Sequence, residues 1–553
     1  MQTIEKLTTA FRGARSDNLG ARGDVVIVGA GLAGLFTALR LAPMPVTVLA
    51  AAPLGQGAAT GWAQGGVAAA VGTADTPAQH AQDTIAAGAG TVDADVAAFV
   101  TSEGPQRIAD LVAYGVPFDR DADGKFLTSQ EAAHAQRRVV HVSGDRTGAS
   151  ILETLVARVW RTPSIRVLEG YEADDLILRD GRIEAVRVVH TNEGGEVYST
   201  IPARAVVLAT GGIGALYAVT TNPAYARGEA IAMAARAGAV IADAEFVQFH
   251  PTAIDVGLDP APLATEALRG EGATLVNRLG TRFMKAIDPR AELAPRDVVA
   301  RAVFSEIAAG RGAFLDCRAA IGARFASAFP TVYALCKRAG IDPAHELIPI
   351  APAAHYHMGG IATDAHGRTS VHGLWAVGEV ASTGLHGGNR LASNSLLEAL
   401  VFAARTATDI ASLAHGKRVE PHADLELTSG ARAVIAGNRS ALIARLRRTM
   451  SDYVGVVRNA AGLRTALSIL SEIENQAGGD RVLANMATAA RFIAAGALVR
   501  EESRGAHERS DFPAPRQLFA ERTFLRLRDN SDGSLSRTPT HVACEWSEHA
   551  GAA

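Results

Sequence analysis

The sequence predicts an α/β fold: a Rossmann-like dinucleotide-binding domain, an α+β capping domain inserted into it, and a C-terminal helical bundle. Three observations lead to this prediction. A glycine-rich turn joins a β-branched run to a helical stretch near the start of the chain. A segment rich in charged motifs and short helices then separates the early strands from a late one. After about Gly416 the apolar residues follow a helical period.

The first element is a strand of the kind found in parallel sheets. Asp24-Val-Val-Ile-Val-Gly29 is a short β-branched run, which predicts burial on both faces of the sheet. Gly29-Ala-Gly-Leu-Ala-Gly34 follows, a helical stretch continues to Leu41, and Val46-Thr-Val-Leu49 forms a second buried strand. The three glycines allow a tight turn, a close approach of the backbone to pyrophosphate and close helix packing, while the helix N-terminus offers N–H donors to phosphates.

The pattern of apolar and polar residues changes twice in the middle of the chain. Short alternating strands are expected over 167–189, with a hairpin turn signal at Asp180-Gly181. Ala205-Val-Val-Leu-Ala-Thr210 returns to the parallel-strand pattern. Residues 242–350 are instead rich in charged motifs and short helices, and we interpret them as a domain inserted into the nucleotide domain. Gly373-Leu-Trp-Ala-Val-Gly378 then resumes the nucleotide-domain pattern.

The C-terminal part predicts a three-helix bundle. Ala431–Met450, Asn459–Gln476 and Val482–Val499 carry apolar residues at i, i+3 and i+4 spacing. A polar, proline-containing, extended tail is expected after them. The predicted boundaries are 22–241 and 355–416 for the two parts of the nucleotide domain, 242–354 for the capping domain, 425–510 for the bundle and 511–553 for the tail.

The composition is that of a folded globular protein. Apolar residues make up 48% and charged residues 20%, and the formal net charge of -3 argues against nucleic acid or anionic membranes as partners. Cys317, Cys336 and Cys544 are far apart and form no C-x-x-C pair, which argues against a disulfide framework or a cysteine-ligated iron–sulfur cluster. No metal site, signal peptide or membrane span is expected, and a reducing cytoplasm suits the chain.

The second strand lacks the acid that a nicotinamide cofactor uses. Ala50 and Ala51 stand at its end, where an acid would bind the ribose of NAD. Glycine clusters instead occur further along, at Ala63-Gln-Gly-Gly66, at the strand end Ala209-Thr-Gly-Gly212 and at Gly378-Glu379, where the glutamate can accept a hydroxyl hydrogen bond. Several strand-end turns that converge on one ligand favour a long cofactor, and we expect FAD.

Six strings extend this interpretation over most of the chain. They are Phe249-His-Pro-Thr252, Thr265-Glu-Ala-Leu-Arg-Gly-Glu-Gly272, Pro295-Arg-Asp297, His355-Tyr-His-Met-Gly-Gly360, His386-Gly-Gly-Asn-Arg-Leu-Ala-Ser-Asn-Ser395 and Glu502-Ser-Arg-Gly-Ala-His507. Together they resemble the flavoprotein family of succinate dehydrogenase, fumarate reductase and L-aspartate oxidase. The resemblance spans about Asp24 to Pro513, with the strings in family order.

Within that family, three details resemble the L-aspartate oxidase branch. Ala59 stands where the membrane-bound members carry the histidine that binds FAD covalently, so the resemblance implies non-covalent FAD. Arg390-Leu-Ala-Ser-Asn-Ser395 replaces the Arg-Leu-Gly-Gly-Asn-Ser of the dehydrogenases. Leu127-Thr-Ser-Gln-Glu131, followed by His134, resembles the oxidase loop that carries an acid for the substrate amino group.

The resemblance also implies the residues of the site. Arg227-Gly-Glu-Ala230 replaces the commoner Gly-Asp-Gly of the family, so Glu229 would make the polar FAD contact there. The expected cofactor-binding residues are Gly29, Ala30, Gly31, Leu32, Ala33, Gly34, Ala51, Thr60, Gln64, Gly65, Gly66, Glu172, Ala173, Thr210, Gly211, Gly212, Glu229, Glu379, Ser395 and Leu396.

The implied reaction is FAD-dependent oxidation of L-aspartate to iminoaspartate, the first step of NAD biosynthesis through quinolinate. Such a substrate needs two anion sites and one cation site, and arginine binds carboxylates through paired hydrogen bonds. The resemblance implies that carboxylates are bound by His250, Thr265, His355 and Arg390, that Glu131 pairs with the ammonium group, and that Arg296 moves a proton with Glu266 as its relay partner. Oxygen or fumarate would accept the electrons, and quinolinate synthase is a candidate recipient of the product.

Taken singly, these residues have plainer interpretations. A histidine before proline, such as His250, is more often a capped loop residue than a ligand. Arg296 could belong to a charged first turn, Arg390 to a surface salt bridge, and Glu131 to a solvated polar loop. Only their joint occurrence in the family strings favours the functional interpretation.

Two other functions stay open on the sequence. A soluble fumarate reductase or succinate dehydrogenase-like flavoprotein would share the carboxylate-binding residues and Arg296 but would not need Glu131. A non-catalytic FAD-fold binding module would keep the glycine-rich turn without the chemistry. The visible spectrum separates an enzyme from a binding module, because L-aspartate would bleach the flavin of the enzyme under anaerobic conditions and would leave that of the module yellow.

Overall fold

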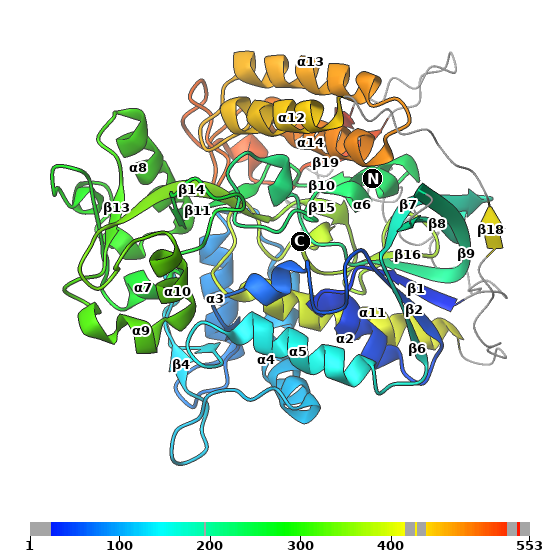
Figure 1. Ribbon diagram of the computed structural model, residues 1–553, viewed down its shortest axis with the longest axis horizontal. Helices are drawn as coiled ribbons and strands as arrows, with labels where there is room; N and C mark the ends of the chain where they lie inside the picture. Colours follow the sequence, from blue (N-terminus) through cyan, green and yellow to red (C-terminus); the bar gives the residue numbers. More distant parts are fainter. Residues whose placement is uncertain (1–23, 193–194, 415–425, 429–437, 528–538, 542–553) are drawn as a thin grey trace, which may run out of the picture.

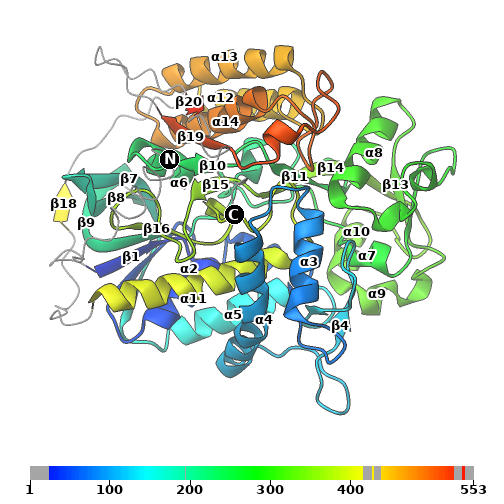
Figure 2. The same ribbon diagram turned by 180° about the vertical axis from the view of Figure 1, so that it is seen from behind.

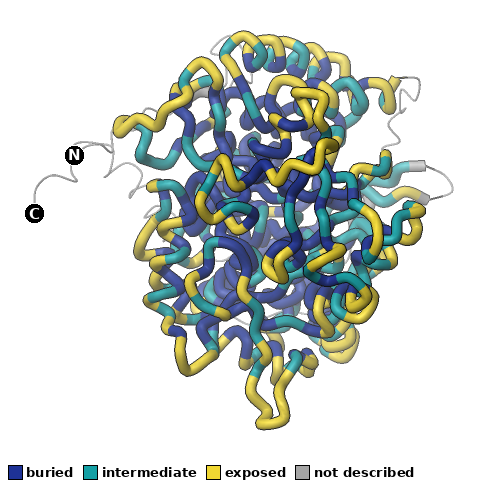
Figure 3. Tube along the Cα trace, turned by 90° about the vertical axis from the view of Figure 1, so that its left-hand side faces the viewer, coloured by how far each residue is buried: buried dark blue, intermediate teal, exposed yellow. Residues whose placement is uncertain are grey.

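The computed structural model describes residues 24–192, 195–414, 426–428, 438–527 and 539–541 (Figure 1). A twisted central sheet carries helices on one face, the inserted segment forms a smaller block beside it, and the C-terminal helices lie over the opposite side (Figure 1). Buried segments fill the interior, and exposed ones lie on outer loops and helix surfaces (Figure 3).

The central sheet joins the strands of the predicted nucleotide domain. Its order is β6-β2-β1-β9-β8-β7, and β16 and β18 also pair with β9. β6, β2, β1, β9 and β16 run parallel, whereas β7, β8 and β9 form an antiparallel meander. The bounds are β1 (Asp24–Val28), β2 (Val46–Ala50), β6 (Ile165–Glu169), β7 (Tyr171–Arg179), β8 (Arg182–Asn192), β9 (Gly195–Leu208), β16 (Leu374–Ala376) and β18 (Glu426–Thr428).

Strand β1 is buried on both faces, as its β-branched run predicts. Val25 and Ile27 pack into the cluster formed with the helices below the sheet, while Val26 and Val28 face the opposite cluster, because side chains alternate along a strand. The first layer gathers α11, α4, α5 and α2 (Figure 2). The helices of this part are α2 (Leu32–Leu41), α3 (Pro77–Ala87), α4 (Ala94–Tyr114), α5 (Thr147–Val159), α6 (Glu229–Arg236) and α11 (Asn394–Ala414).

The predicted hairpin turn between β7 and β8 is confirmed. Asp180 and Gly181 have φ values of 53° and 73°. Two successive left-handed residues are the geometry of the tight turn that matches strand twist, and Asp-Gly is a favoured pair there.

The inserted segment folds around its own core. Its four-stranded antiparallel sheet has the order β11-β14-β13-β12, and a separate cluster of buried residues lies between this sheet and its helices. The elements are β11 (Val247–Ile254), β12 (Thr274–Val276), β13 (Phe314–Asp316), β14 (Ile348–His357), α7 (Ala267–Gly270), α8 (Arg296–Ala308), α9 (Phe325–Ala328) and α10 (Pro330–Arg338).

Two smaller sheets contain the remaining described strands. The three-stranded sheet has the order β3-β5-β4 and the five-stranded sheet the order β17-β15-β10-β19-β20. Their strands are β3 (Val67–Ala68), β4 (Thr128–Ser129), β5 (Val139–Val140), β10 (Ile241–Ala242), β15 (Gly360–Ala362), β17 (Ala381–Ser382), β19 (Phe524–Leu527) and β20 (Pro539–His541). Short 3-10 helices are η1 (Ala59–Trp62), η2 (Gly214–Leu216), η3 (Phe283–Ala286), η4 (Ala291–Leu293), η5 (Gly322–Arg324), η6 (Gly378–Val380) and η7 (Gln517–Phe519).

Part of the segment predicted as an extended tail joins the five-stranded sheet. Strand β19 lies within the 511–553 segment but pairs antiparallel with β10, and Leu525 is fully buried. The short apolar run Phe524-Leu-Arg-Leu527 is surrounded by polar residues, so it does not stand out in the composition of the segment. Its burial depends on a strand almost 300 residues away.

The C-terminal helices α12 (Arg439–Tyr453), α13 (Ala460–Gln476) and α14 (Arg481–Val499) pack on one another in the order of the predicted bundle. The start of the first predicted helix, at 431–437, lies outside the described residues. Among the described helices, α14 alone is long and apolar enough to cross a membrane, and 78% of its apolar window is buried inside the fold. It is therefore the core helix of this bundle. The predicted domain boundaries stay a prediction.

The packing of α2 against the first turn gives a testable expectation at Gly34. A Cβ atom at Gly34 would lie 2.0 Å from the carbonyl oxygen of Gly29, so Gly34→Ala must push the helix away from the turn. Overpacking of this kind costs about 1–3 kcal/mol. We expect a lower midpoint of thermal unfolding and weaker retention of the cofactor, measured by differential scanning fluorimetry and visible absorbance.

Gly72→Ala is the matched control. No atom lies within 4 Å of a Cβ built at Gly72, so this variant should unfold as the wild type does. Equal midpoints for the two variants would contradict the packing argument.

Candidate active site

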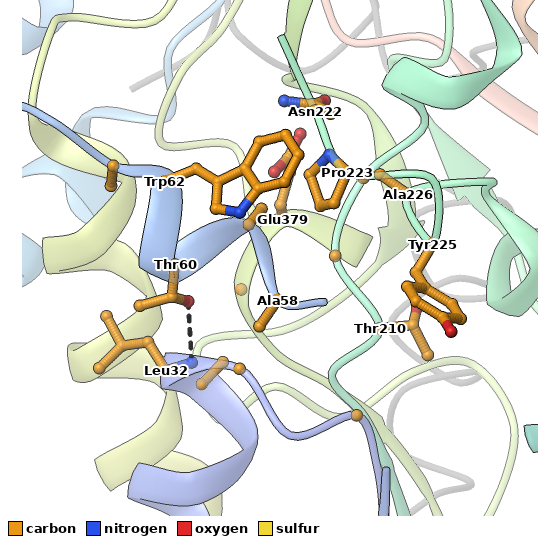
Figure 4. A pocket seen from close by; sticks show the side chains of 18 of the residues that line it. Leu32, Ala58, Thr60, Trp62, Thr210, Asn222, Pro223, Tyr225, Ala226 and Glu379 are labelled. Carbon is orange, nitrogen blue, oxygen red and sulfur yellow. Dashed lines mark hydrogen bonds between the residues drawn. The ribbon is translucent and has the colours of Figure 1, made fainter. Parts of the chain in front are cut away.

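The glycine-rich turn between β1 and α2 lines a deep pocket. Gly29 has a φ of 112°, and a Cβ there would meet the carbonyl oxygen of Ala209 at 2.3 Å, so only glycine fits against the end of β9. The backbone N–H of Leu32, at the start of α2, donates to Thr60 Oγ1 at 3.0 Å (Figure 4). Gly31, Leu32 and Ala33 line the pocket, so the N-terminus of α2 faces it, and N–H groups at a helix N-terminus suit an anionic phosphate.

Segments far apart in the sequence enclose the same pocket. Figure 4 shows Trp62, Pro223 and Tyr225 around it, from segments that follow different strands. Of the expected cofactor-binding residues, the pocket is lined by Gly29, Ala30, Gly31, Leu32, Ala33, Ala51, Thr60, Gln64, Gly65, Gly66, Glu172, Ala173, Thr210, Gly211, Gly212, Glu229, Glu379, Ser395 and Leu396. Gly34 instead packs beneath the turn, against Gly29.

A half-buried arginine that the sequence reasoning missed lies between two of these acids. Arg227 Nη2 donates to Glu172 Oε2 at 2.7 Å and lies 2.6 Å from Glu229 Oε1. Burial raises the pKa of Glu229 to about 7, against the attraction of Arg227. Its position two residues before Glu229, in the string that departs from the family pattern, was the available signal. Arg227 thus holds both carboxyl groups in place at the pocket wall.

The pocket wall offers polar atoms that fit a long polar cofactor. Burial raises the pKa of Glu379 to about 7, and its Oε1 accepts a hydrogen bond from the backbone N–H of His357 at 3.0 Å. Gln64 Oε1, Asn222 Oδ1 and Arg390 Nε are buried and lack a hydrogen-bond partner within the described part of the chain. Buried polar atoms normally have partners, so a ligand that supplies them fits this pocket.

The seven expected catalytic and substrate-binding residues all line one end of the same pocket. They are Glu131, His250, Thr265, Glu266, Arg296, His355 and Arg390. They come from the loop after β4, from β11 and β14, from the two residues directly before α7, from the first turn of α8 and from the loop before α11. All are buried except His355, which is partly buried. The solvated-loop and surface-salt-bridge interpretations of Glu131 and Arg390 are therefore wrong.

The pairing of β11 with β14 brings the two histidines together. The rings of His250 and His355 meet edge to face, with centroids 4.9 Å apart. Burial and the nearby Arg296 lower the pKa of both imidazoles well below the ordinary value. Both histidines are therefore neutral at pH 7, and each can offer one N–H to a carboxylate oxygen.

Gln248 connects the two arginines and was not predicted. Its Oε1 accepts hydrogen bonds from Arg296 Nη1 at 3.1 Å and from Arg390 Nη2 at 3.0 Å. Its Nε2 donates to the backbone oxygen of Arg390 at 2.9 Å. Gln248 lies two residues before His250 on β11, hence on the same face of the strand, and that spacing was a signal the sequence contained. The amide holds both guanidinium groups at fixed positions.

Glu266 is the counter-charge of Arg296. Arg296 Nε donates to Glu266 Oε2, and Arg269 Nη2 lies 3.3 Å from the same oxygen. Burial raises the pKa of Glu266, but Arg296 and Arg269 outweigh burial, and the net pKa is lowered. Glu266 is therefore ionised and hydrogen-bonded to the side chain expected to move a proton.

Within the described residues Arg390 forms no ion pair with an acidic side chain, unlike Arg296. Burial, followed by repulsion from Arg296, lowers its pKa to about 10. Its guanidinium carbon lies 4.4 Å from the ring centroid of Tyr356, whose hydroxyl donates to Glu398 Oε2 at 2.9 Å. Glu398 also bonds His386 at 2.9 Å. The buried Tyr356 ring thus packs against the Arg390 guanidinium group, a contact that the sequence did not indicate.

Glu131 brings an acid into this cationic end of the pocket. Burial and the neighbouring Glu266 raise its pKa, and Ser393 Oγ donates to its Oε2 at 2.8 Å. The next backbone N–H, of Ala132, donates to Glu266 Oε1 at 3.0 Å. The loop is therefore attached directly to the Arg296–Glu266 pair. Within the described residues no group of three or more His, Cys, Asp or Glu side chains is placed to hold a metal ion.

Comparison with known proteins agrees with this geometry. The FAD binding domain family matches residues 24–396, and the fumarate reductase flavoprotein C-terminal family matches residues 480–549. The L-aspartate oxidase of Caulobacter vibrioides is 52% identical over 511 residues, which cover 92% of this chain and 97% of that protein. The L-aspartate oxidase of Agrobacterium fabrum is 48% identical over 93% of this chain and 96% of that protein.

This chain belongs to the L-aspartate oxidase family. Solved structures of relatives share its fold: the FrdA chain of Escherichia coli quinol fumarate reductase superposes with a TM-score of 0.84 at 28% identity, covering 94% of this chain and 96% of that one. Mycobacterium smegmatis Sdh1 superposes with a TM-score of 0.79 at 32% identity, covering 94% of each chain. The predicted family, fold class and FAD cofactor are confirmed, and the roles of individual site residues stay predictions.

Arg296 opens helix α8, and it is the first residue to test. Arg296→Leu removes the proposed proton-transfer group and leaves Arg390 and both histidines in place. FAD content and part of the dicarboxylate affinity should survive, while turnover falls by on the order of 10²–10⁴-fold. Absorbance titration and steady-state kinetics measure the two effects.

Arg290→Leu is the control for the loss of a guanidinium group. Arg290 is exposed and pairs with Asp288 in the loop before α8, so its loss should leave turnover unchanged. Near-normal turnover of Arg296→Leu would refute its assignment.

Proposed function

We propose that this chain oxidises L-aspartate to iminoaspartate with non-covalently bound FAD, in the cytoplasm, as the first step of NAD biosynthesis through quinolinate. Oxygen or fumarate would be the electron acceptor, and quinolinate synthase would receive the product. The observation that carries the proposal is the buried Glu131 carboxyl group among Arg296, Arg390 and two neutral histidines. Glu266 is already paired with Arg296, so Glu131 is the acid that could pair with an ammonium group, while the arginines and histidines could bind two carboxylates.

The cationic side chains would bind the two carboxylates. Arg390 has a buried Nε without a hydrogen-bond partner within the described residues, and its guanidinium group can make paired hydrogen bonds to a carboxylate. His250, His355 and Thr265 lie around it and can donate single hydrogen bonds. These contacts would fix the substrate between the pocket wall of the nucleotide domain and the inserted segment.

When bound along the pocket lined by the glycine-rich turn, FAD would serve as the two-electron oxidant that accepts a hydride from the substrate. The residues of the chain would then manage the charges and the proton. Glu131 would pair with the ammonium group, whose positive charge favours the ionised carboxyl. Arg296, held by Glu266 and Gln248, would move a proton on the other side of the substrate. Arginine suits this role only in a buried site with neighbours that shape the proton path, because its ordinary pKa exceeds 12.

A fumarate reductase or succinate dehydrogenase-like activity is the second candidate. The structural likeness to the fumarate reductase FrdA chain favours it as a property of the family. It would use the same arginines and histidines, and only Glu131 would have no partner in such a substrate. Anaerobic bleaching of the flavin by L-aspartate, compared with succinate, tests the proposal directly.

The first prediction concerns the attachment of the cofactor. Ala59 lines the pocket at the position where a histidine would form a covalent bond, and a methyl side chain cannot form one. Acid precipitation should therefore release free FAD into the supernatant, measured by its absorbance and fluorescence. Yellow colour that stays with the protein pellet would contradict this prediction.

The second prediction separates the two candidate reactions. An ammonium group in this cationic site needs a counter-charge, since a buried charge left unpaired costs about 3–5 kcal/mol. Glu131→Gln should therefore weaken L-aspartate oxidation strongly, while fumarate reduction by the chemically reduced enzyme survives, because fumarate has no amino group. Steady-state kinetics with both substrates give the ratio.

Glu271→Gln serves as its control, because Glu271 is an exposed acid of the inserted segment. That variant should keep both activities. Equal loss of both activities in Glu131→Gln, or loss of neither, would show that Glu131 does not bind the amino group.

A further inference from the structure

Two residues close to the Glu131 carboxyl group have a backbone conformation that side chains disfavour. Ser393 has a φ of 60°, and Ala133, two residues after Glu131, has a φ of 66°. Residues other than glycine rarely adopt these left-handed values, and they persist only where the surrounding structure imposes them. Such strain often marks a functional position, which raises the question of what each residue gains there.

The contacts around Ser393 supply the answer for that residue. Its hydroxyl donates to Glu131 Oε2 at 2.8 Å, and its backbone oxygen accepts from the N–H of Ala68 at 3.1 Å. The preceding backbone oxygen, of Ala392, is bonded to His134 Nε2 at 2.9 Å. Ser393 is 8% exposed. The left-handed turn is thus held from both sides, and it directs one hydroxyl group at one carboxylate oxygen.

The second oxygen of Glu131 faces the pocket wall. A Cβ atom built at Gly65 would lie 3.0 Å from Glu131 Oε1 and 3.2 Å from Ser393 Oγ. Gly65 itself lines the pocket that we assign to the cofactor and substrate. Glu131, Ser393 and Gly65 therefore meet at one point, and glycine at that point leaves room for Oε1 to be reached from the pocket.

We propose that Ser393 is a positioning residue that determines specificity for the amino group. Its hydroxyl, directed by the left-handed backbone, fixes the Glu131 carboxylate so that Oε1 is presented to the ammonium group of the substrate. The proposal rests on the proposed function, because only an amino-dicarboxylate substrate gives Glu131 a partner. Ser393 would act on the substrate through Glu131, and its own side chain need not contact the substrate.

The electrostatics agree with this geometry. The charged groups that face the Glu131 carboxyl are Glu266, Arg269, Arg296 and Arg390. Burial and Glu266 raise its pKa, while Arg296, the Ser393 hydroxyl and Arg390 oppose that rise. Loss of the hydroxyl should therefore raise the pKa of Glu131, and the ionised form that pairs with an ammonium group would be lost at a higher pH on acidification.

Two variants separate the hydroxyl group from the backbone strain. Ser393→Ala and Ser393→Gly both remove the hydrogen bond, but only alanine keeps a side chain at φ 60°. Both should lower kcat/KM for L-aspartate by about tenfold or more, as expected for a lost hydrogen bond to a charged group. Fumarate reduction by the chemically reduced holoenzyme should change less than about threefold. Ser393→Gly should unfold at a higher temperature than Ser393→Ala.

The pH profile provides a readout that a purely structural role would not move. The acidic limb of kcat/KM for L-aspartate should shift to higher pH in both Ser393 variants. Ala133→Gly is the matched control, because it relieves the same kind of strain in the loop that carries Glu131 without removing a hydrogen-bonding group. It should keep the wild-type ratio of the two activities and the wild-type acidic limb, with an equal or higher unfolding temperature.

Each contrary outcome has a distinct meaning. If both Ser393 variants keep the wild-type ratio and acidic limb while Glu131→Gln loses L-aspartate oxidation, the inference is overturned and the proposed function stands. A parallel loss of fumarate reduction in the Ser393 variants also overturns it, since Ser393 would then support the site as a whole. If L-aspartate does not bleach the wild-type flavin, the proposed function fails and this inference fails with it.

Discussion

Two buried guanidinium groups that share one amide oxygen are the constraint around which this site is built. Arg296 and Arg390 both donate to Gln248 Oε1, at 3.1 and 3.0 Å. Like charges in a buried pocket destabilise the fold unless other groups neutralise them. Glu266 neutralises Arg296, whereas burial and Arg296 lower the pKa of Arg390 to about 10. A carboxylate of a bound ligand would supply the counter-charge that Arg390 lacks among the described residues.

This constraint requires the inserted segment and the nucleotide domain to keep a defined relative position. Arg296 opens α8 in the first, and Arg390 precedes α11 in the second. Asn389 Nδ2 donates to Asp297 Oδ1 at 3.1 Å, directly beside both arginines. At the far side of the block, Asp145 Oδ1 accepts from the hydroxyl of Thr331 at 2.9 Å, at the start of α10. These contacts across the boundary hold the two arginines close to Gln248.

The acids of the pocket show how position decides the state of a carboxyl group. Glu266 contacts two arginines, and its pKa is lowered. Glu131 lies against a serine hydroxyl and another acid, and its pKa is raised. Glu379, which accepts one backbone N–H, has its pKa raised to about 7 by burial. Three glutamates in one pocket therefore differ in pKa because their neighbours differ, and each neighbour comes from another part of the chain.

The amino-acid sequence by itself determined the first strand, the glycine turn and the helix after it, because these depend on side-chain branching and on glycine within about 20 residues. It also determined the family, through strings whose order along the chain is readable without a fold. The sequence did not indicate the roles of Gln248, Arg227 and Tyr356, or the burial of strand β19. Gln248 and Tyr356 face each other only through the register of β11 with β14, and β19 is buried only by β10.

Only the tertiary structure determined the hydrogen bonds and charge interactions among the site residues. The sequence placed Glu131 in a polar loop, and folding buried it against Ser393, which lies 262 residues further along. The left-handed backbone of Ser393 has no signature in the residue itself, since it arises from contacts with Ala68 and from the His134 bond to Ala392. Burial, charge and strain are sums over neighbours in space, and a linear order of residues does not contain those neighbours until the chain has folded.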